Sequence, residues 1–177
     1  FKLFCRKRSD AEKVFIAVKQ WLNERLKLEI SEEKSKIVNL KRHYSEFLGF
    51  ELKAVKKRNK YVVRSHMTPK AKSRETEKLI EQIKRIAHTK DRDDEAKEVT
   101  IYNSMVIGIH NYYRFATMIA SDCDGIHRNV STVMKNRLYG RLSKKGHINE
   151  VYIRKQYGKS KQIRFISSKT VCPIGYI

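Results

Sequence analysis

The stretch from Val99 to Phe115 most constrains the fold of this chain, because its apolar side chains recur at helical spacing. Val99, Tyr102, Val106 and Ile109 follow one another at intervals of three and four residues, which is the pattern of a helix buried on one side. Such a helix needs neighbouring elements to cover its apolar side. We expect the polar residues of the stretch on the opposite, exposed side: Asn103, Ser104, His110, Asn111 and Arg114.

The charge of the chain predicts a polyanionic partner. Lys and Arg number 40 against 19 Asp and Glu, so the formal net charge is +21 at pH 7, far more than solubility requires. Hydrophobic residues make up 40% of the chain, enough to form a folded core rather than a disordered basic tail. No apolar run is long enough to span a bilayer, so we expect no membrane partner and favour nucleic acid as the polyanion.

The cysteines predict a reducing compartment and no metal site. Cys5, Cys123 and Cys172 are an odd, widely spaced set, which fits neither a disulfide framework nor a paired metal knuckle. Cys123 and His127 have a suitable spacing for metal ligands but lack a second pair. We therefore expect a cytoplasmic protein.

The first part of the chain predicts a helix packed on a small antiparallel sheet. Ser9 and Glu12 have the spacing of a capping box, and the apolar residues that follow continue at helical spacing as far as Leu26. A polar turn, Ser31 to Lys34, separates two short segments of alternating pattern. The expected strands are residues 1–5, 28–30, 36–40, 46–54 and 61–66.

The second part predicts a bundle of three helices. Thr68 and Pro69 have the residue types of a helix start, and the apolar residues from Leu79 to Ala87 lie along one stripe. Residues 88–98 are expected to be a polar connection to the helix that opens at Val99, and residues 121–129 a turn after it. A third helix is expected from about Val130. Beyond Gly146 the pattern indicates an irregular basic tail, so the predicted fold class is α+β.

Four segments carry a resemblance to a known family. LKLEISEEKSKI (26–37) and SEFLGFEL (45–52) resemble the sixth and seventh conserved blocks of bacterial reverse transcriptases. IYNSMVIGIHNYYRF (101–115) and RLYGRLSKK (137–145) resemble domain X of group II intron maturases. The chain therefore resembles a group II intron-encoded reverse transcriptase and maturase over nearly its whole length.

The resemblance implies a right-hand polymerase. Residues 1–67 would be the C-terminal part of the palm, residues 68–146 the thumb or domain X, and residues 147–177 a basic extension toward a further domain. The Tyr-x-Asp-Asp box of the family would directly precede Phe1 and is absent from this chain. Two-metal phosphoryl transfer needs those carboxylates to hold Mg²⁺, so we expect no cofactor and no polymerase activity in this chain alone.

The resemblance also implies partners and roles. The intact bacterial protein would be an RNA-directed DNA polymerase that uses Mg²⁺, joins these residues to the remaining fingers and palm, and promotes RNA splicing. Its partners would be group II intron RNA and an RNA/DNA template-primer duplex. Lys34 would lie near the incoming nucleotide as an auxiliary catalytic residue. The primer grip would be formed by Phe47, Leu48, Gly49 and Phe50.

The RNA-binding candidates combine polar residues of the helix at Val99 with cations of the neighbouring helices. These are Lys70, Lys72, Arg74, Asn103, His110, Asn111, Tyr112, Arg114, Arg128, Arg137, Arg141, Lys144 and Lys145. Read without the family, Phe47 and Leu48 are expected in a core, Gly49 permits close approach of another backbone, and Tyr113 is expected in the core while Tyr112 is free to contact RNA.

Two alternatives remain open. The chain could be a stand-alone RNA-binding or splicing module that acts without catalysis. It could also belong to another bacterial reverse transcriptase lineage, such as a retron or diversity-generating enzyme, although the helix at Val99 and the later RLYGRL segment favour the maturase.

Overall fold

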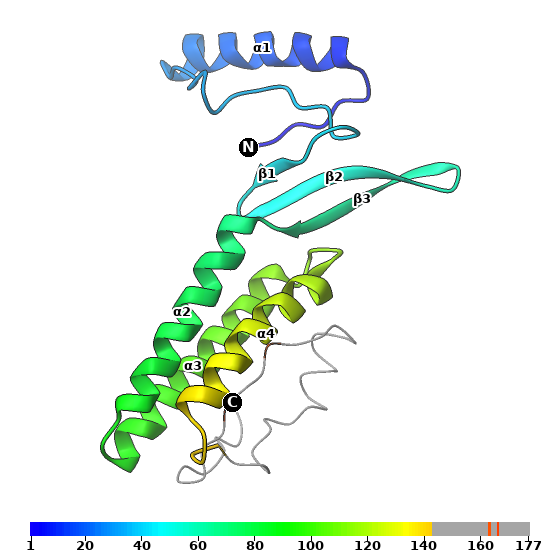
Figure 1. Cartoon of the computed structure of the whole chain (residues 1–177). Coiled ribbons are helices and arrows are strands. Elements are labelled where there is room, and N and C mark those ends of the chain that lie inside the picture. Colours follow the sequence, from blue (N-terminus) through cyan, green and yellow to red (C-terminus); the bar gives the residue numbers. More distant parts are fainter. Residues whose placement is uncertain (143–162, 164–165, 167–177) are drawn as a thin grey trace. The chain divides into compact units, whose positions relative to one another are not determined.

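The computed structural model describes residues 1–142 together with Ile163 and Ile166, and it has an α+β fold (Figure 1). The described elements are α1 (Arg8–Leu26), β1 (Ser45–Phe47), β2 (Phe50–Lys57), β3 (Lys60–Met67), α2 (Pro69–His88), α3 (Arg92–Tyr113) and α4 (Ile119–Arg137). The chain divides into two compact units. The first is Phe1–Phe47 with Glu51–Val63, and the second is Leu48–Phe50 with Arg64–Ile177. The described part contains no helix that could cross a membrane.

Helix α1 confirms the expected helix but not its expected packing. Its N-cap is Lys7, which makes no side-chain cap bond, so the predicted capping box from Ser9 is wrong. The helix ends where Lys27 adopts a left-handed conformation, with φ of 53°, and the N–H of Lys27 bonds the carbonyl of Asn23 at 3.2 Å, as in the αL capping motif. No residue of α1 is buried, so the expected helix packed on a sheet is not seen.

The sheet contains only the later of the expected strands. Its order is β1-β2-β3, with antiparallel neighbours, and residues 1–5, 28–30 and 36–40 form no strand. Two tight connections produce this topology. Leu48 and Gly49 both have positive φ, 49° and 78°, as a type I′ hairpin turn requires, and only Arg58 and Asn59 connect β2 to β3. The predicted pairing of two strands in this region is confirmed, but the expected strand 46–54 is broken by the turn at Leu48 and Gly49, and the expected loop 55–59 is only two residues long.

Helix α2 begins where the sequence predicted, whereas α3 begins earlier. The Thr68 side chain accepts a hydrogen bond from the Ala71 N–H at 3.2 Å, and Pro69 occupies the first helical position. The expected connection 88–98 is mostly the first two turns of α3, because the Asp91 side chain accepts from the Asp94 N–H at 2.8 Å. Acidic residues in that first turn also interact favourably with the helix dipole.

Helix α4 contains the segment that was expected to be a turn. It starts at Ile119 and includes Gly125, a residue that usually weakens a helix interior by about 1 kcal/mol. A Cβ there would lie 2.6 Å from Nζ of Lys72, the flexible end of a side chain. Because residues 121–129 lie within the helix, the prediction of a turn there is wrong.

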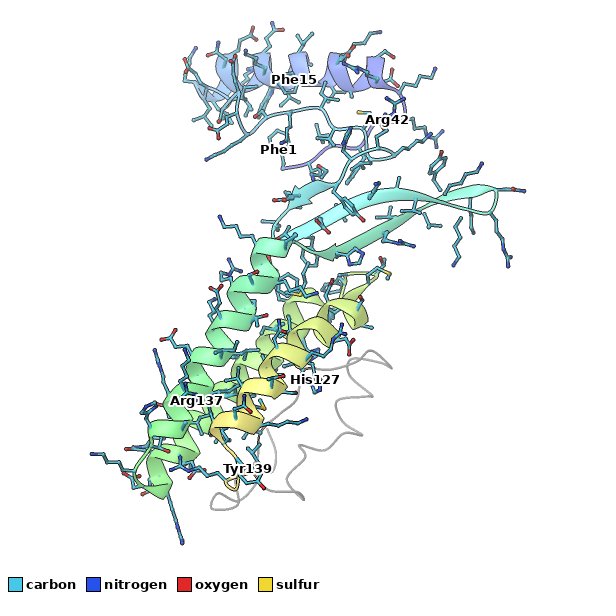
Figure 2. The ribbon with its side chains drawn as sticks, viewed as in Figure 1. Phe1, Phe15, Arg42, His127, Arg137 and Tyr139 are labelled. Carbon is cyan, nitrogen blue, oxygen red and sulfur yellow. The ribbon has the colours of Figure 1, made fainter. Side chains whose placement is uncertain are left out.

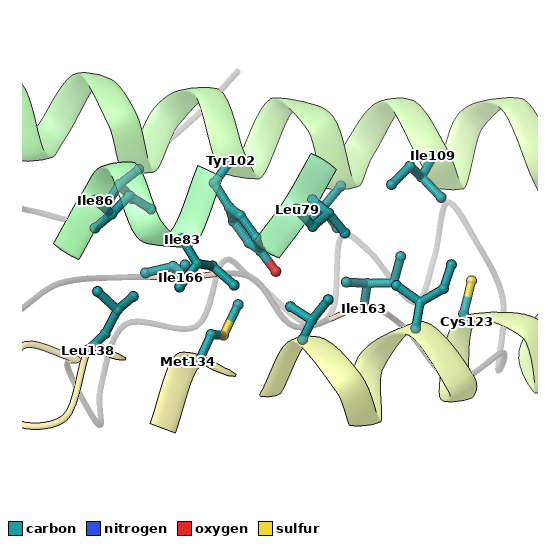
Figure 3. Close-up of a cluster of buried hydrophobic side chains, with 14 of the residues drawn as sticks. Leu79, Ile83, Ile86, Tyr102, Ile109, Cys123, Met134, Leu138, Ile163 and Ile166 are labelled. Atoms are coloured by element: carbon teal, nitrogen blue, oxygen red, sulfur yellow. The ribbon is translucent and has the colours of Figure 1, made fainter. Parts of the chain in front are cut away.

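Helices α2, α3 and α4 share one hydrophobic core in the second unit, with α2 packed against both others (Figure 3). Leu79, Ile83 and Ile86 of α2 are at most 1% exposed. The fully buried apolar residues that meet them are Tyr102, Val106, Cys123, Ile126, Val130, Met134, Leu138 and Ile163. Tyr113 is also buried, which confirms its expected place in the core.

Candidate nucleic-acid interface

The segment resembling the primer grip forms the turn between β1 and β2. Leu48 is 66% exposed and Phe47 is 37% exposed, so the expectation that both lie in a core is wrong. The Thr68 N–H donates to the Gly49 carbonyl at 2.9 Å, but the space that a Cβ of residue 49 would occupy lies against the Tyr113 side chain rather than against the second backbone that was predicted. The turn therefore presents two apolar side chains on the surface while its backbone is fixed at the start of α2.

Two tyrosines at the end of α3 hold this turn from the other side. The Tyr112 hydroxyl donates to the Leu48 carbonyl at 2.9 Å, and the Tyr112 ring stacks on Phe50 with centroids 5.7 Å apart. The Tyr113 hydroxyl lies so near Gly49 that a Cβ there would be 3.0 Å from it. The Tyr112 hydroxyl thus has an intramolecular partner, although the side chain remains 51% exposed.

Lys34 lies on the predicted polar turn and is exposed. Its side chain makes no ion pair with a described residue. This position leaves the ammonium group accessible to an anionic ligand.

Two RNA-binding candidates on α3 are buried, which corrects the expectation that they lie on its exposed side. Asn103 is 7% exposed and His110 is 2% exposed. The Asn103 side chain accepts from the Ile166 N–H and donates to the Ile166 carbonyl, both at 3.0 Å. Nε2 of His110 accepts from the Ile163 N–H at 3.1 Å. These side chains satisfy backbone groups inside the protein, so we no longer count them as RNA contacts.

The buried position of His110 also determines its charge. Burial lowers the pKa of His110 to about 4, because an apolar environment disfavours the imidazolium. The ring is therefore neutral at pH 7. Since its Nε2 accepts a hydrogen bond, the proton of the neutral ring is on Nδ1.

Arg141 is used within the protein as well. Its guanidinium donates to the carbonyls of Ile86 at 3.0 Å, Ala87 at 3.3 Å and Thr89 at 3.4 Å. These carbonyls lie at the C-terminal end of α2, where helix backbone acceptors lack partners and a cation is favoured. Arg141 also lies beyond the end of α4 at Arg137, so it is a helix cap rather than a member of an exposed helical stripe.

Three further candidates are paired with carboxylates. Nζ of Lys72 lies 3.8 Å from Asp122, whose side chain is 7% exposed, and the same carboxylate accepts from the Met67 N–H at 2.9 Å. Arg74 pairs with Glu75 at 2.8 Å, and this partner raises the pKa of the guanidinium. Arg128 pairs with Asp124 at 3.3 Å. Arg74 and Arg128 are exposed and can still reach a phosphate, whereas Lys72 is anchored.

The remaining described candidates are exposed. Lys70 lies in the first turn of α2, Arg137 in the last turn of α4 (labelled in Figure 2), and Asn111 near the end of α3. The Arg114 guanidinium lies 4.7 Å from the centre of the Phe115 ring. Lys144 and Lys145 lie outside the described residues.

A basic segment that the sequence reasoning overlooked lies on the β2–β3 hairpin. Residues 52–74 contain nine Lys and Arg and no Asp or Glu, and nitrogen-tipped side chains project from the turn end of the hairpin (Figure 2). The sequence feature that could have revealed this segment is the absence of Asp and Glu over 23 residues, since no recognisable motif marks it.

No family model matches this chain, and no curated protein sequence matches it. Among the described residues, no group of His, Cys, Asp and Glu side chains is arranged to hold a metal ion.

Proposed function

We propose that this chain is the end of the palm and the thumb, or domain X, of a group II intron-encoded reverse transcriptase and maturase. In this proposal the chain binds the backbone of intron RNA and of the template-primer duplex. The intact protein copies RNA into DNA with Mg²⁺ and assists splicing in the bacterial cytoplasm.

The observation that carries the nucleic-acid part of the proposal is the surplus of cations. Even if each of the 19 acidic residues paired with one cation, 40 − 19 = 21 Lys and Arg would have no acidic partner. Charges of one sign repel one another and destabilise a compact chain. A polyanion removes that repulsion and releases its condensed counterions on binding.

The order of elements supports the more specific proposal. A helix is followed by a small antiparallel sheet and then by three helices that share a core, which is the order that the resemblance implies. In the FLGF segment Phe47 and Leu48 are exposed, whereas Phe50 is half-buried and stacks on Tyr112. The backbone of the turn is held by Tyr112 and Thr68. A rigid turn with accessible side chains is suited to contact a primer strand.

A salt titration with two RNAs tests the proposal on the whole chain. The probes are a group II intron RNA and an unrelated structured RNA of the same length, each followed by fluorescence anisotropy. We expect both affinities to fall by about a thousandfold or more between about 50 and 200 mM salt, as for 6–10 neutralised phosphates. We also expect the intron RNA to bind more tightly at each salt concentration.

The two readouts separate the general part of the proposal from the specific one. An affinity that does not respond to salt would contradict binding through phosphates. Equal affinity for the two RNAs would contradict the assignment to an intron-specific maturase while leaving nucleic-acid binding in place.

A further inference from the structure

The turn of the β2–β3 hairpin concentrates positive charge without any acidic partner. Lys56, Lys57, Arg58 and Lys60 are all exposed, and none of them forms an ion pair with a side chain in the described part of the chain. The hairpin turn and its flanking residues, 56–60, thus contain four cations among five residues. Below, "hairpin tip" means these four residues.

The pairing of the strands increases the repulsion. Since β2 ends at Lys57 and β3 begins at Lys60, the two lysines lie directly opposite each other across the two-residue connection. Like charges in that position destabilise a hairpin. Arg58 adds a third cation in the left-handed conformation, with φ of 55°, where Gly or Asn is the more favourable residue. The residue types at positions 57, 58 and 60 therefore add positive charge at the expense of the stability of the hairpin.

Two further lysines add charge beside the same hairpin: Lys53 belongs to β2, and Lys41 comes from the segment before β1. Nζ of Lys41 lies 4.3 Å from the centre of the Tyr61 ring, and Nζ of Lys53 lies 5.0 Å from that of Tyr44. Each ammonium covers one face of a tyrosine that could otherwise stack on a base. This arrangement favours contacts with phosphates over the reading of bases.

We propose that the hairpin tip is a further phosphate-binding surface that contacts the nucleic-acid backbone without regard to sequence. The proposal rests on the proposed function, because it takes the partner to be a nucleic acid. It adds a contact that the helical candidates do not provide. The exposed cations at the tip would each neutralise a phosphate, and binding would relieve the repulsion between Lys57 and Lys60.

The test compares two variants of the full chain that each lose four positive charges. The hairpin variant is K56Q/K57Q/R58N/K60Q, in which Asn tolerates the positive φ at residue 58. The control variant is K7Q/K13Q/K19Q/R25Q on or beside α1, whose side chains are also exposed. The probe is a fluorescein-labelled stem-loop RNA of arbitrary sequence, titrated at several salt concentrations.

We expect the hairpin variant to bind about tenfold more weakly or worse at low salt. The slope of log affinity against log salt should become shallower by about three to four, since each of the four lost phosphate contacts contributes roughly 0.7 to 0.9 to the slope. The control should change the slope by less than about one. Conservative replacement, K56R/K57R/K60R, should retain the wild-type affinity and slope, which separates lost charge from a misfolded hairpin.

Three results would overturn the inference. The first is a hairpin variant whose slope equals that of the control, while the wild-type chain still shows steep salt dependence; the proposed function would then stand without this surface. The second is displacement of the RNA by polyglutamate of equal charge as efficiently as by RNA, which would indicate an acidic protein partner. The third is a wild-type chain with no salt-dependent RNA binding, which would remove the proposed function as well.

Discussion

The Tyr112 hydroxyl donates to the carbonyl of Leu48 at 2.9 Å, although the two residues lie 64 positions apart in the chain. This bond fixes the β1–β2 turn against the end of α3, and the Phe50 ring stacks on the same tyrosine. The segments that resemble two separate family motifs are thereby joined within the second unit.

Replacing Tyr112 by Phe tests that bond. The variant keeps the ring on Phe50 and removes only the hydroxyl, so we expect the free energy of unfolding to fall by about 0.5–1 kcal/mol. Tyr112→Ala should lose more because the ring contact disappears too. Urea denaturation measures both, and an unchanged midpoint for Tyr112→Phe would show that water replaces the bond without loss.

Two glycines should respond in opposite directions to replacement by Ala. Gly49 has φ of 78° and a Cβ there would meet the Tyr113 hydroxyl at 3.0 Å, so Gly49→Ala should destabilise the protein by at least about 1–2 kcal/mol. Gly108 lies in α3 with nothing within 4 Å of an added Cβ, so Gly108→Ala should stabilise it by about 0.5–1 kcal/mol. Thermal or urea unfolding of the pair provides the measurement. Equal changes in the free energy of unfolding for the two variants would contradict the claim that the backbone at Gly49 requires glycine.

His110 should make stability depend on pH in an acidic window. Its pKa is about 4 in the folded chain and about 6.5 when unfolded, so the unfolded state binds more protons between these values. Stability should therefore be highest above pH 6.5 and fall by a few kcal/mol as the pH decreases toward 4. His110→Gln, which cannot titrate, should show a flatter unfolding profile across this window; the same slope in both proteins would refute the assignment.

Arg141 and Arg137 should separate structural from binding effects. Arg141→Met removes the donor from three carbonyls at the end of α2 and should destabilise the protein by about 1–3 kcal/mol, because hydrogen bonds from a charged group are lost. Arg137→Met removes an exposed cation and should change stability by less than about 0.5 kcal/mol while weakening RNA binding. Unfolding and anisotropy on the same samples check both. If only Arg137→Met reduced the free energy of unfolding, then Arg137 rather than Arg141 would have the structural role.

Local sequence patterns predicted the features that depend on near neighbours. The Thr68-Pro69 start of α2 and the β2–β3 hairpin follow from a capping side chain, a fixed proline φ and two strand-like runs close in the chain. The buried stripe from Val99 to Tyr113 also follows directly from residue spacing. The pattern overlooked the start of α3, because the N-cap at Asp91 stands within a polar segment that resembles a loop.

By itself, the sequence determined the α+β class, the apolar side of α3 and the surplus of positive charge, since each depends on residue type and spacing. Only the tertiary structure decided which polar residues remain exposed. Asn103 and His110 bond the backbone at Ile166 and Ile163, and Arg141 caps α2, because distant segments bring unsatisfied backbone groups to them. Helical spacing cannot predict such partners, since a buried polar side chain is stabilised by whichever donor or acceptor the fold places beside it.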